Sequence, residues 1–348
     1  LDEKSIQLKQ VLNRKFSLRK NYSIYDLSRV KSGSVISPVA NKKISLRSWL
    51  GILTNKEITK NYKSRYDNKK SVFIDSGLYE FQASLSSDIK ERPNDFINLF
   101  IKNATQIIDD YIYTMYNALA YSSLANEVSI EKLEQLFNIF NYKSNYNYAP
   151  LICEIISRKD NTNWSEDTIK MLLDIYDDII CGKIKNNYII ESGNSDRDIA
   201  EKFETKVINS SIYKLSSAIA NILYNNPDNT KYFIEIIEDM SKSDDEIIKY
   251  SSMTTLNCLL NDHYDWASKI IIDLFSNDYI YGYRSNRRIL SLIYEKSKEN
   301  REKIIRIILH GITIDSNEIK KVFSYLMVEF NLFYDEFKKE LTDEKNDK

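Results

Sequence analysis

WSEDTIKMLLDIYDDIICG, residues 164–182, is the clearest guide to the fold class of this chain. Its apolar side chains recur every three or four positions, at Ile169, Leu172, Leu173, Tyr176, Ile179 and Ile180. This spacing places them on one face of an α-helix. Ser165 precedes the pattern and suits an N-cap, and Glu166 and Asp167 put negative charge at the positive end of the helix. Gly182 follows the last apolar residue, where a helix commonly ends in the left-handed conformation.

Similar helical patterns recur from about residue 45 to residue 326. The expected helix starts are Ser45, Pro93, Ser129, Ser243 with Glu246 as a capping box, and Asp315 with Glu318 as a second box. Residues 55–75 are polar and rich in lysine, and they predict a helix end followed by an exposed loop. A second loop is expected over 185–197, which is polar and contains Gly193.

The composition agrees with a helical fold, because only 7 Gly and 4 Pro occur among 348 residues. Tight hairpins and phosphate-binding loops need glycine where φ is positive. Helix pairs recur at roughly 35–45 residues, which is the period of HEAT and armadillo repeats. We therefore predict an all-α chain that forms a HEAT/armadillo-like α-solenoid of stacked antiparallel helix pairs. A single compact helical bundle is the alternative.

The predicted organisation has three parts. Residues 1–75 form N-terminal helices and a basic linker region, residues 76–341 form the helical-repeat domain, and residues 342–348 form a frayed tail. The chain begins at Leu1 without an initiating Met, which indicates a piece of a longer protein. Three tryptophans, Trp49, Trp164 and Trp266, are expected in the core or at seams between helices.

Charge, cysteine usage and hydropathy indicate a cytoplasmic protein without a membrane role. The net charge is −1, so no overall field draws the chain to nucleic acid or to anionic lipid. No apolar run approaches the roughly 20 residues that span a bilayer, and no signal peptide opens the sequence. Cys153, Cys181 and Cys258 lie far apart without CxxC spacing, and we expect buried reduced thiols.

Catalytic and cofactor motifs are missing from the sequence. It contains no GxxxxGK[ST], GxGxxG or GxSxG motif, and two histidines are too few for a HExxH zinc site. Adjacent carboxylates occur at 109–110, 177–178 and 244–245, but adjacent helical residues point about 100° apart and do not converge as a catalytic pair. We therefore expect no catalytic residues, no metal ligands and no cofactor.

The strongest local candidate for binding is the segment 279–288. Its tentative site residues are Tyr279, Tyr281, Tyr283, Arg284, Arg287 and Arg288. Alternate tyrosines followed by arginines can stack on and neutralise a ligand, including single-stranded nucleic acid. The alternative is a turn whose tyrosines cover the edge of the repeat array while the arginines stay solvated. The basic clusters at 9–20 and 56–70 are expected to be solvated faces.

Several short motifs resemble a known family when they are read in order. Ser37-Pro38 followed by Ser45, Trp49 and Leu50 resembles the entry to the C-terminal helical region of large bacterial STAND-type (NACHT-like) NTPases of anti-phage defence. The next motifs are similar to that region as well: Phe81 and Leu85 running to Arg92-Pro93-Asn94-Asp95-Phe96, then Trp164-Ser165-Glu166-Asp167, then Ile208-Asn209-Ser210 with Ala218-Ile219-Ala220. The chain departs from the pattern at Tyr213, where a small residue is expected, and at Gly77, which alone represents a glycine-rich segment.

The resemblance implies a role rather than a reaction. It implies a HEAT-like sensor region that binds a protein partner, including one derived from a phage, and thereby relieves autoinhibition of an NTPase module. Two alternatives from the residues themselves stay open: a nucleic-acid-binding HEAT-like protein, including a DNA glycosylase-like enzyme, and a structural assembly scaffold. Binding to nucleic acid would require the basic clusters and the segment 279–288 to share one face.

Overall fold

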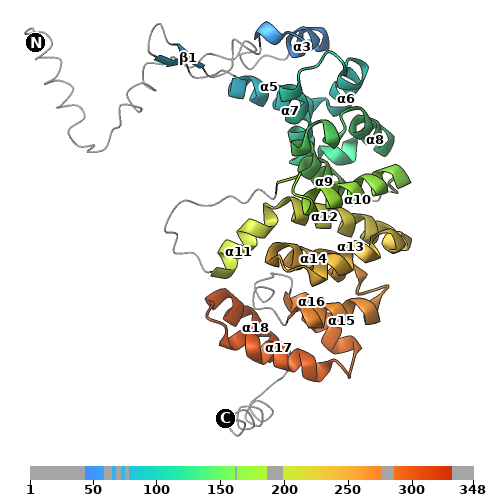
Figure 1. The fold of residues 1–348 in the computed structure, drawn as a ribbon, viewed down its shortest axis with the longest axis vertical. Coiled ribbons are helices and arrows are strands. Elements are labelled where there is room, and N and C mark those ends of the chain that lie inside the picture. The colour runs from blue at the N-terminus through green and yellow to red at the C-terminus, as the bar shows by residue number, and fades with distance from the viewer. Residues whose placement is uncertain are drawn as a thin grey trace, which may run out of the picture. The chain divides into compact units, whose positions relative to one another are not determined.

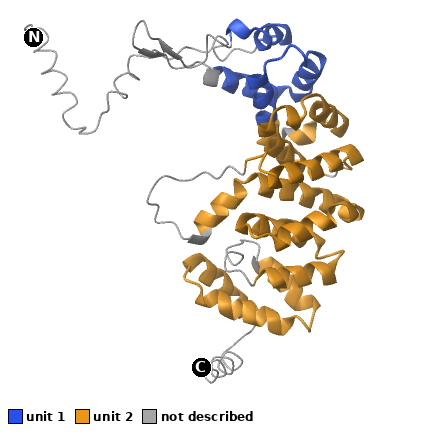
Figure 2. Ribbon diagram, in the orientation of Figure 1, with its two compact units in different colours: residues 1–118 blue, residues 119–348 orange. Residues whose placement is uncertain are grey.

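The computed structural model describes residues 44–58, 65–67, 72–74, 78–160, 163–185, 199–275 and 286–330. Within these ranges the ordered elements are helices, apart from two three-residue strands. None of the described helices combines the length and the apolar character needed to cross a membrane. The predicted basic cluster at 9–20 and the predicted tail 342–348 lie outside the described residues. The chain divides into two compact units, residues 1–118 and 119–348 (Figure 2).

The first unit consists of helices and one small sheet. Its elements are α3 (Leu46–Leu53), β1 (Arg65–Asp67), β2 (Val72–Ile74), α5 (Leu78–Glu91), α6 (Pro93–Lys102) and most of α7 (Asp109–Ala120). The strands pair antiparallel, with Tyr66 opposite Phe73. They lie in the stretch for which the sequence predicts a helix end and a loop. Aromatic and β-branched residues in both strands favour extended backbone, which explains the local pairing.

A buried aromatic cluster joins α3, α5 and α6 in the first unit. Trp49, Phe81 and Phe96 are each no more than 1% exposed, and the ring centroid of Trp49 lies 5.5 Å from that of Phe81 and 6.1 Å from that of Phe96. Trp49 Nε1 also donates a hydrogen bond of 2.7 Å to Asp88 Oδ2. The motif residues that carry the family resemblance here are therefore packing residues of one core.

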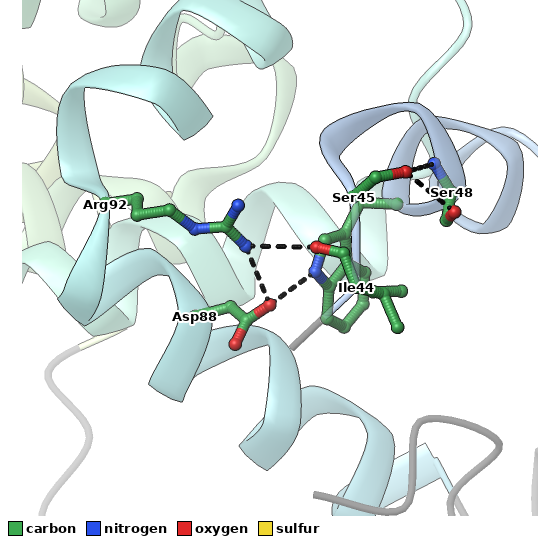
Figure 3. A network of polar contacts seen from close by, with 6 residues as sticks. Ile44, Ser45, Ser48, Asp88 and Arg92 are labelled. Carbon is green, nitrogen blue, oxygen red and sulfur yellow. Dashed lines mark hydrogen bonds and ion pairs between the residues drawn. The ribbon is translucent and has the colours of Figure 1, made fainter. Parts of the chain in front are cut away.

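Asp88 is the centre of a small polar network at this core (Figure 3). Besides the indole of Trp49, its Oδ2 accepts a bond of 3.0 Å from the guanidinium of Arg92, which also donates to the carbonyl of Ile44 at 3.3 Å. The Ser45 hydroxyl accepts from Ser48 N at the start of α3, as the predicted N-cap requires. The network fixes the start of α3 against the end of α5.

The second unit is built from helices that follow one another closely in the sequence. They are η1 (Ser123–Glu127), α8 (Ile130–Ile139), η2 (Tyr142–Ser144), η3 (Tyr146–Tyr148), α9 (Ala149–Arg158), α10 (Glu166–Ile180), α11 (Ile199–Ile208), α12 (Ser211–Asn225), η4 (Pro227–Asn229), α13 (Thr230–Lys242), α14 (Glu246–Leu259), α15 (Tyr264–Leu274), α16 (Asn286–Lys296), α17 (Arg301–Thr313) and α18 (Asn317–Glu329). The η elements are 3₁₀-helices.

The helices of this unit can be described as two rows (Figure 1). Helix α12 lies between α9 and α14, and α16 packs on α18; we call α9, α12, α14, α16 and α18 the second row. Helices α10 and α13 contact each other and cover α12 and α14, and we call α8, α10, α13, α15 and α17 the first row. Consecutive members of the two rows, such as α13 with α14 and α17 with α18, pack in pairs.

Aromatic side chains of the first row donate hydrogen bonds to carboxylates on neighbouring helices. Tyr176 of α10 donates to Asp239 of α13, and Trp266 of α15 donates to Glu238 of α13 at 3.0 Å. Tyr232 of α13 donates to Glu166 at the start of α10, at 3.3 Å. The bond from Trp266 is the main cause that lowers the pKa of Glu238. Each bond ties one helix pair to the next at a defined position.

The predicted helix ends are confirmed in α10 and corrected in two other helices. Ser165 caps α10 by accepting from Thr168 N, and Gly182 follows its end with a φ of 74°. The predicted capping box at Ser243 is wrong, because Asp245 caps α14 by accepting from two backbone N–H groups. A carboxylate at this position gains from the helix dipole as well as from the hydrogen bonds.

The predicted box at Asp315 is wrong in the same way. Ser316 caps α18 and accepts from Ile319 N, whereas Asp315 is exposed and lies 3.6 Å from Lys320 Nζ.

The three tryptophans lie where we predicted: Trp49 and Trp164 are buried, and Trp266 of α15 lies at the seam with α13.

Candidate binding surface

Two of the six predicted site residues can be placed, at the start of α16. Tyr279, Tyr281, Tyr283 and Arg284 lie outside the described residues. Arg287 and Arg288 are both exposed.

Arg287 is engaged within the protein. Its Nε donates to Glu329 Oε2 of α18 at 2.7 Å, and its guanidinium lies 5.7 Å from the ring centroid of Tyr325. Ser291 Oγ also donates to this carboxylate, at 3.1 Å. Arg287 therefore links α16 to α18 and has its charge balanced there.

A second tyrosine with cations lies at the opposite end of the second row. Tyr121 follows α7 and is 48% exposed. Lys214 Nζ of α12 lies 2.7 Å from its hydroxyl oxygen and 5.3 Å from its ring centroid. The guanidinium of Arg158, at the end of α9, lies 5.9 Å from the same centroid and is paired with Glu154 at 2.7 Å. Two cations from two helices thus meet one exposed aromatic ring.

Neutral polar side chains join these two ends. The hydroxyl of Tyr213 on α12 lies against Thr254 of α14, and burial is the main cause that raises its pKa. One turn further along α14, Cys258 Sγ lies 3.6 Å from Thr254 O. Burial raises the pKa of the Cys258 thiol to about 11, against the opposing charge of Arg288 on α16.

We call this set of exposed and half-buried residues the tyrosine surface. It comprises Tyr121, Arg158, Tyr213, Lys214, Thr254, Cys258, Arg287, Arg288 and Tyr325. It has members on all five helices of the second row. Tyr121 lies near cations of α9 and α12, Tyr213 of α12 lies against Thr254 of α14, and Arg287 of α16 bonds Glu329 of α18.

Helices α12 and α14, in the middle of the second row, are poor in charge. Lys214 is the only charged residue in the fifteen residues of α12, and α14 has only Glu246 and Lys249 among fourteen. In the first row, α10 has five acidic residues and one lysine. Surfaces that bind proteins are poor in charge at their centre and rich in tyrosine and arginine. The tyrosine surface has this composition, whereas the face of α10 does not.

The described side chains form no recognisable metal or redox centre. Within these ranges, no group of three or more His, Cys, Asp or Glu side chains converges as metal ligands. All three cysteines are unpaired. Burial raises the pKa of Cys153 to about 12, as expected for an inert core thiol. The expectation of a buried thiol is wrong for Cys181, which is exposed because it forms the C-cap of α10.

Comparison with known proteins returns no relative. No protein-family model, no curated protein and no solved structure matches this chain. The chemistry of the tyrosine surface is therefore the basis for a functional proposal.

Sequence reasoning missed the Tyr121 end of this surface. Tyr121 and Lys214 are 93 positions apart, so no local pattern connects them. One signal was available in the sequence: Lys214 is a lone charge within a long helix of apolar and small polar residues. A single charge in such a helix is conspicuous because exposed helical faces are normally rich in charged residues.

Proposed function

We propose that this chain is a non-catalytic, cytoplasmic scaffold of HEAT/armadillo-like helix pairs that binds a protein partner through the tyrosine surface. The packing supports a repeat array, because α12, α14, α16 and α18 each pack on a first-row helix, and α12 also packs on α9 and α14 within its own row. In such arrays one row of helices forms an extended binding face. The defence-sensor role, with a phage-derived partner, rests on the family resemblance alone.

The observation that carries the proposal is the charge-poor composition of the tyrosine surface. Tyr213 and Thr254 lie at its centre, with cations towards the two ends. The carboxylates that act on Tyr213 are Glu204 of α11, which is buried, and Glu154 of α9, which pairs with Arg158. A binder of extended nucleic acid needs a basic groove that follows the phosphate backbone. Arg287 is neutralised by Glu329, and Arg158 by Glu154, which favours a protein partner over nucleic acid.

Co-expression with a library of phage proteins tests this proposal. We expect a stoichiometric phage protein to co-purify with the wild-type chain. We expect it to be lost from Tyr213→Glu, which places a charge at the centre of the surface. Lys170→Glu is the matched control, because Lys170 lies on the exposed face of α10.

Two outcomes would contradict the proposal. One is a partner that is lost equally with both variants. The other is recovery of nuclease-sensitive nucleic acid instead of protein, which would support the nucleic-acid-binding alternative.

A further inference from the structure

Two cations of the tyrosine surface, Arg287 and Lys214, differ in how they are neutralised. Arg287 meets the carboxylate of Glu329 at 2.7 Å, so its charge is balanced within the protein. Lys214 instead contacts the hydroxyl of Tyr121, which is a neutral group. Among the described residues, no carboxylate oxygen lies within ion-pair distance of Lys214 Nζ. The Tyr121 end therefore carries one positive charge, that of Lys214, that no carboxylate of the described residues balances.

A second cation lies close to this charge. Arg158 and Lys214 approach the same ring, at 5.9 Å and 5.3 Å from its centroid. Glu154 balances one of these charges and is itself largely covered, with 17% of its side chain exposed. Glu154 therefore presents little acidic surface to an incoming carboxylate. Charge-assisted hydrogen bonds from lysine and arginine to a carboxylate are stronger than the bond from lysine to a neutral phenol.

The aromatic ring between the cations adds apolar contact area. The side chain of Tyr121 is 48% exposed, and tyrosine and arginine are the residue types most often found at energetic centres of interfaces. A carboxylate on a flexible backbone fits this arrangement because its neighbouring methylene and peptide groups can cover the ring. A phosphate backbone fits less well, since the adjoining centre of the surface offers hydroxyl groups rather than further cations.

We propose that Tyr121, Lys214 and Arg158 form the docking point for an acidic segment of the partner protein, an inference that rests on the proposed function of the tyrosine surface. The segment would place one carboxylate between the Lys214 ammonium and the Arg158 guanidinium. Its neighbouring residues would continue over α12 towards Tyr213.

Fluorescence anisotropy with a labelled peptide of alternating Glu and Gly tests this inference on the full chain. We expect the acidic peptide to bind, and the matched peptide of alternating Gln and Gly not to bind. Lys214→Gln should weaken binding by roughly fivefold, as expected for the loss of one exposed charge contact. Tyr121→Phe should retain binding, because it removes only the neutral partner of Lys214 and keeps the ring.

Lys231→Gln is the matched control. Lys231 Nζ also lies over a tyrosine ring, at 4.9 Å from the centroid of Tyr232, but in the first row. This variant should bind the acidic peptide as the wild type does. Equal loss with Lys214→Gln and Lys231→Gln would overturn the inference, as would equal binding of the acidic and neutral peptides. Tighter Lys214-dependent binding of a single-stranded oligonucleotide of equal charge would also overturn it.

The two proposals can fail separately. If a phage protein co-purifies equally with the wild type and with Lys214→Gln, the scaffold proposal stands and the acidic-segment inference fails. If no protein co-purifies but the acidic peptide binds in a Lys214-dependent way, the docking chemistry stands and the proposed sensor role fails.

Discussion

Replacing Asp88 by alanine should lower the free energy of unfolding of the first unit, because this carboxylate accepts hydrogen bonds from two side chains. The mutation leaves the indole N–H of Trp49 buried without an acceptor and removes the partner of Arg92. The variant loses a hydrogen bond to a charged group and leaves the indole N–H of Trp49 buried without an acceptor. Together these effects should lower the free energy of unfolding by about 3 kcal/mol. The ion pair with Arg92 adds less, since 30% of that side chain is exposed.

Two measurements check this magnitude. Urea unfolding followed by circular dichroism should show a midpoint lower by roughly 1–3 M for the transition of the first unit. Hydrogen exchange should show faster exchange in α3 and α5, which the network joins, while α12 and α14 stay protected.

Asp174→Ala is the matched control. It removes an exposed pair with Lys143, in which 52% of the aspartate side chain and 55% of the lysine side chain are exposed. We expect a change below ~1 kcal/mol for this variant. If Asp88→Ala destabilises the chain no more than Asp174→Ala does, the network in Figure 3 is not a stabilising feature and the reasoning is refuted.

Further predictions concern the backbone, the thiols and pH. Gly182→Ala should lower the melting temperature, at a cost of about 1–2 kcal/mol, because φ is 74° at this position. Gly51→Ala within α3 should instead raise stability by up to ~1 kcal/mol. At neither position would the added methyl group meet another atom within 4 Å. A thiol reagent at mildly alkaline pH should label Cys181 at once and Cys153 only after unfolding, and labelling of both in the native state would contradict the described burial. The neighbouring lysine ammonium and a tyrosine hydroxyl lower the pKa of Asp178, so its contribution is present above pH ~4 and is lost as the pH falls through the lowered value. The fall in melting temperature on acidification should therefore be smaller in Asp178→Asn than in the wild type.

The sequence predicts the helices better than their ends or their contacts. The 3.6-residue period of α10 identifies its buried face, because Ile169, Leu172 and Tyr176 must all meet the core. The start of α14 was misplaced, because two acceptors close together, Ser243 and Asp245, can both cap a helix there. Which of them does so depends on where the packed helix begins.

The candidate surface could be predicted only in part. The sequence shows Arg287 and Arg288 as part of a local cluster of tyrosines and arginines. It does not show that Glu329 neutralises Arg287, because the two residues lie 42 positions apart. The bond between Lys214 and Tyr121 spans 93 positions and depends on how α12 lies against the chain that follows α7. Single-sequence patterns report the period of a helix and not its neighbours.

The acidic pair in the middle of the first row has a consequence for the curvature of this part of the protein. Glu238 and Asp239 are adjacent in α13, so their side chains leave the helix about 100° apart. One accepts from Trp266 of α15 and the other from Tyr176 of α10, so the pair fixes the angle at which the two neighbouring helices flank α13. Glutamate reaches one methylene further than aspartate. Exchanging the two residues would lengthen the connection from α13 to α10 and shorten the connection from α13 to α15. The row would then bend towards one side without any change in composition.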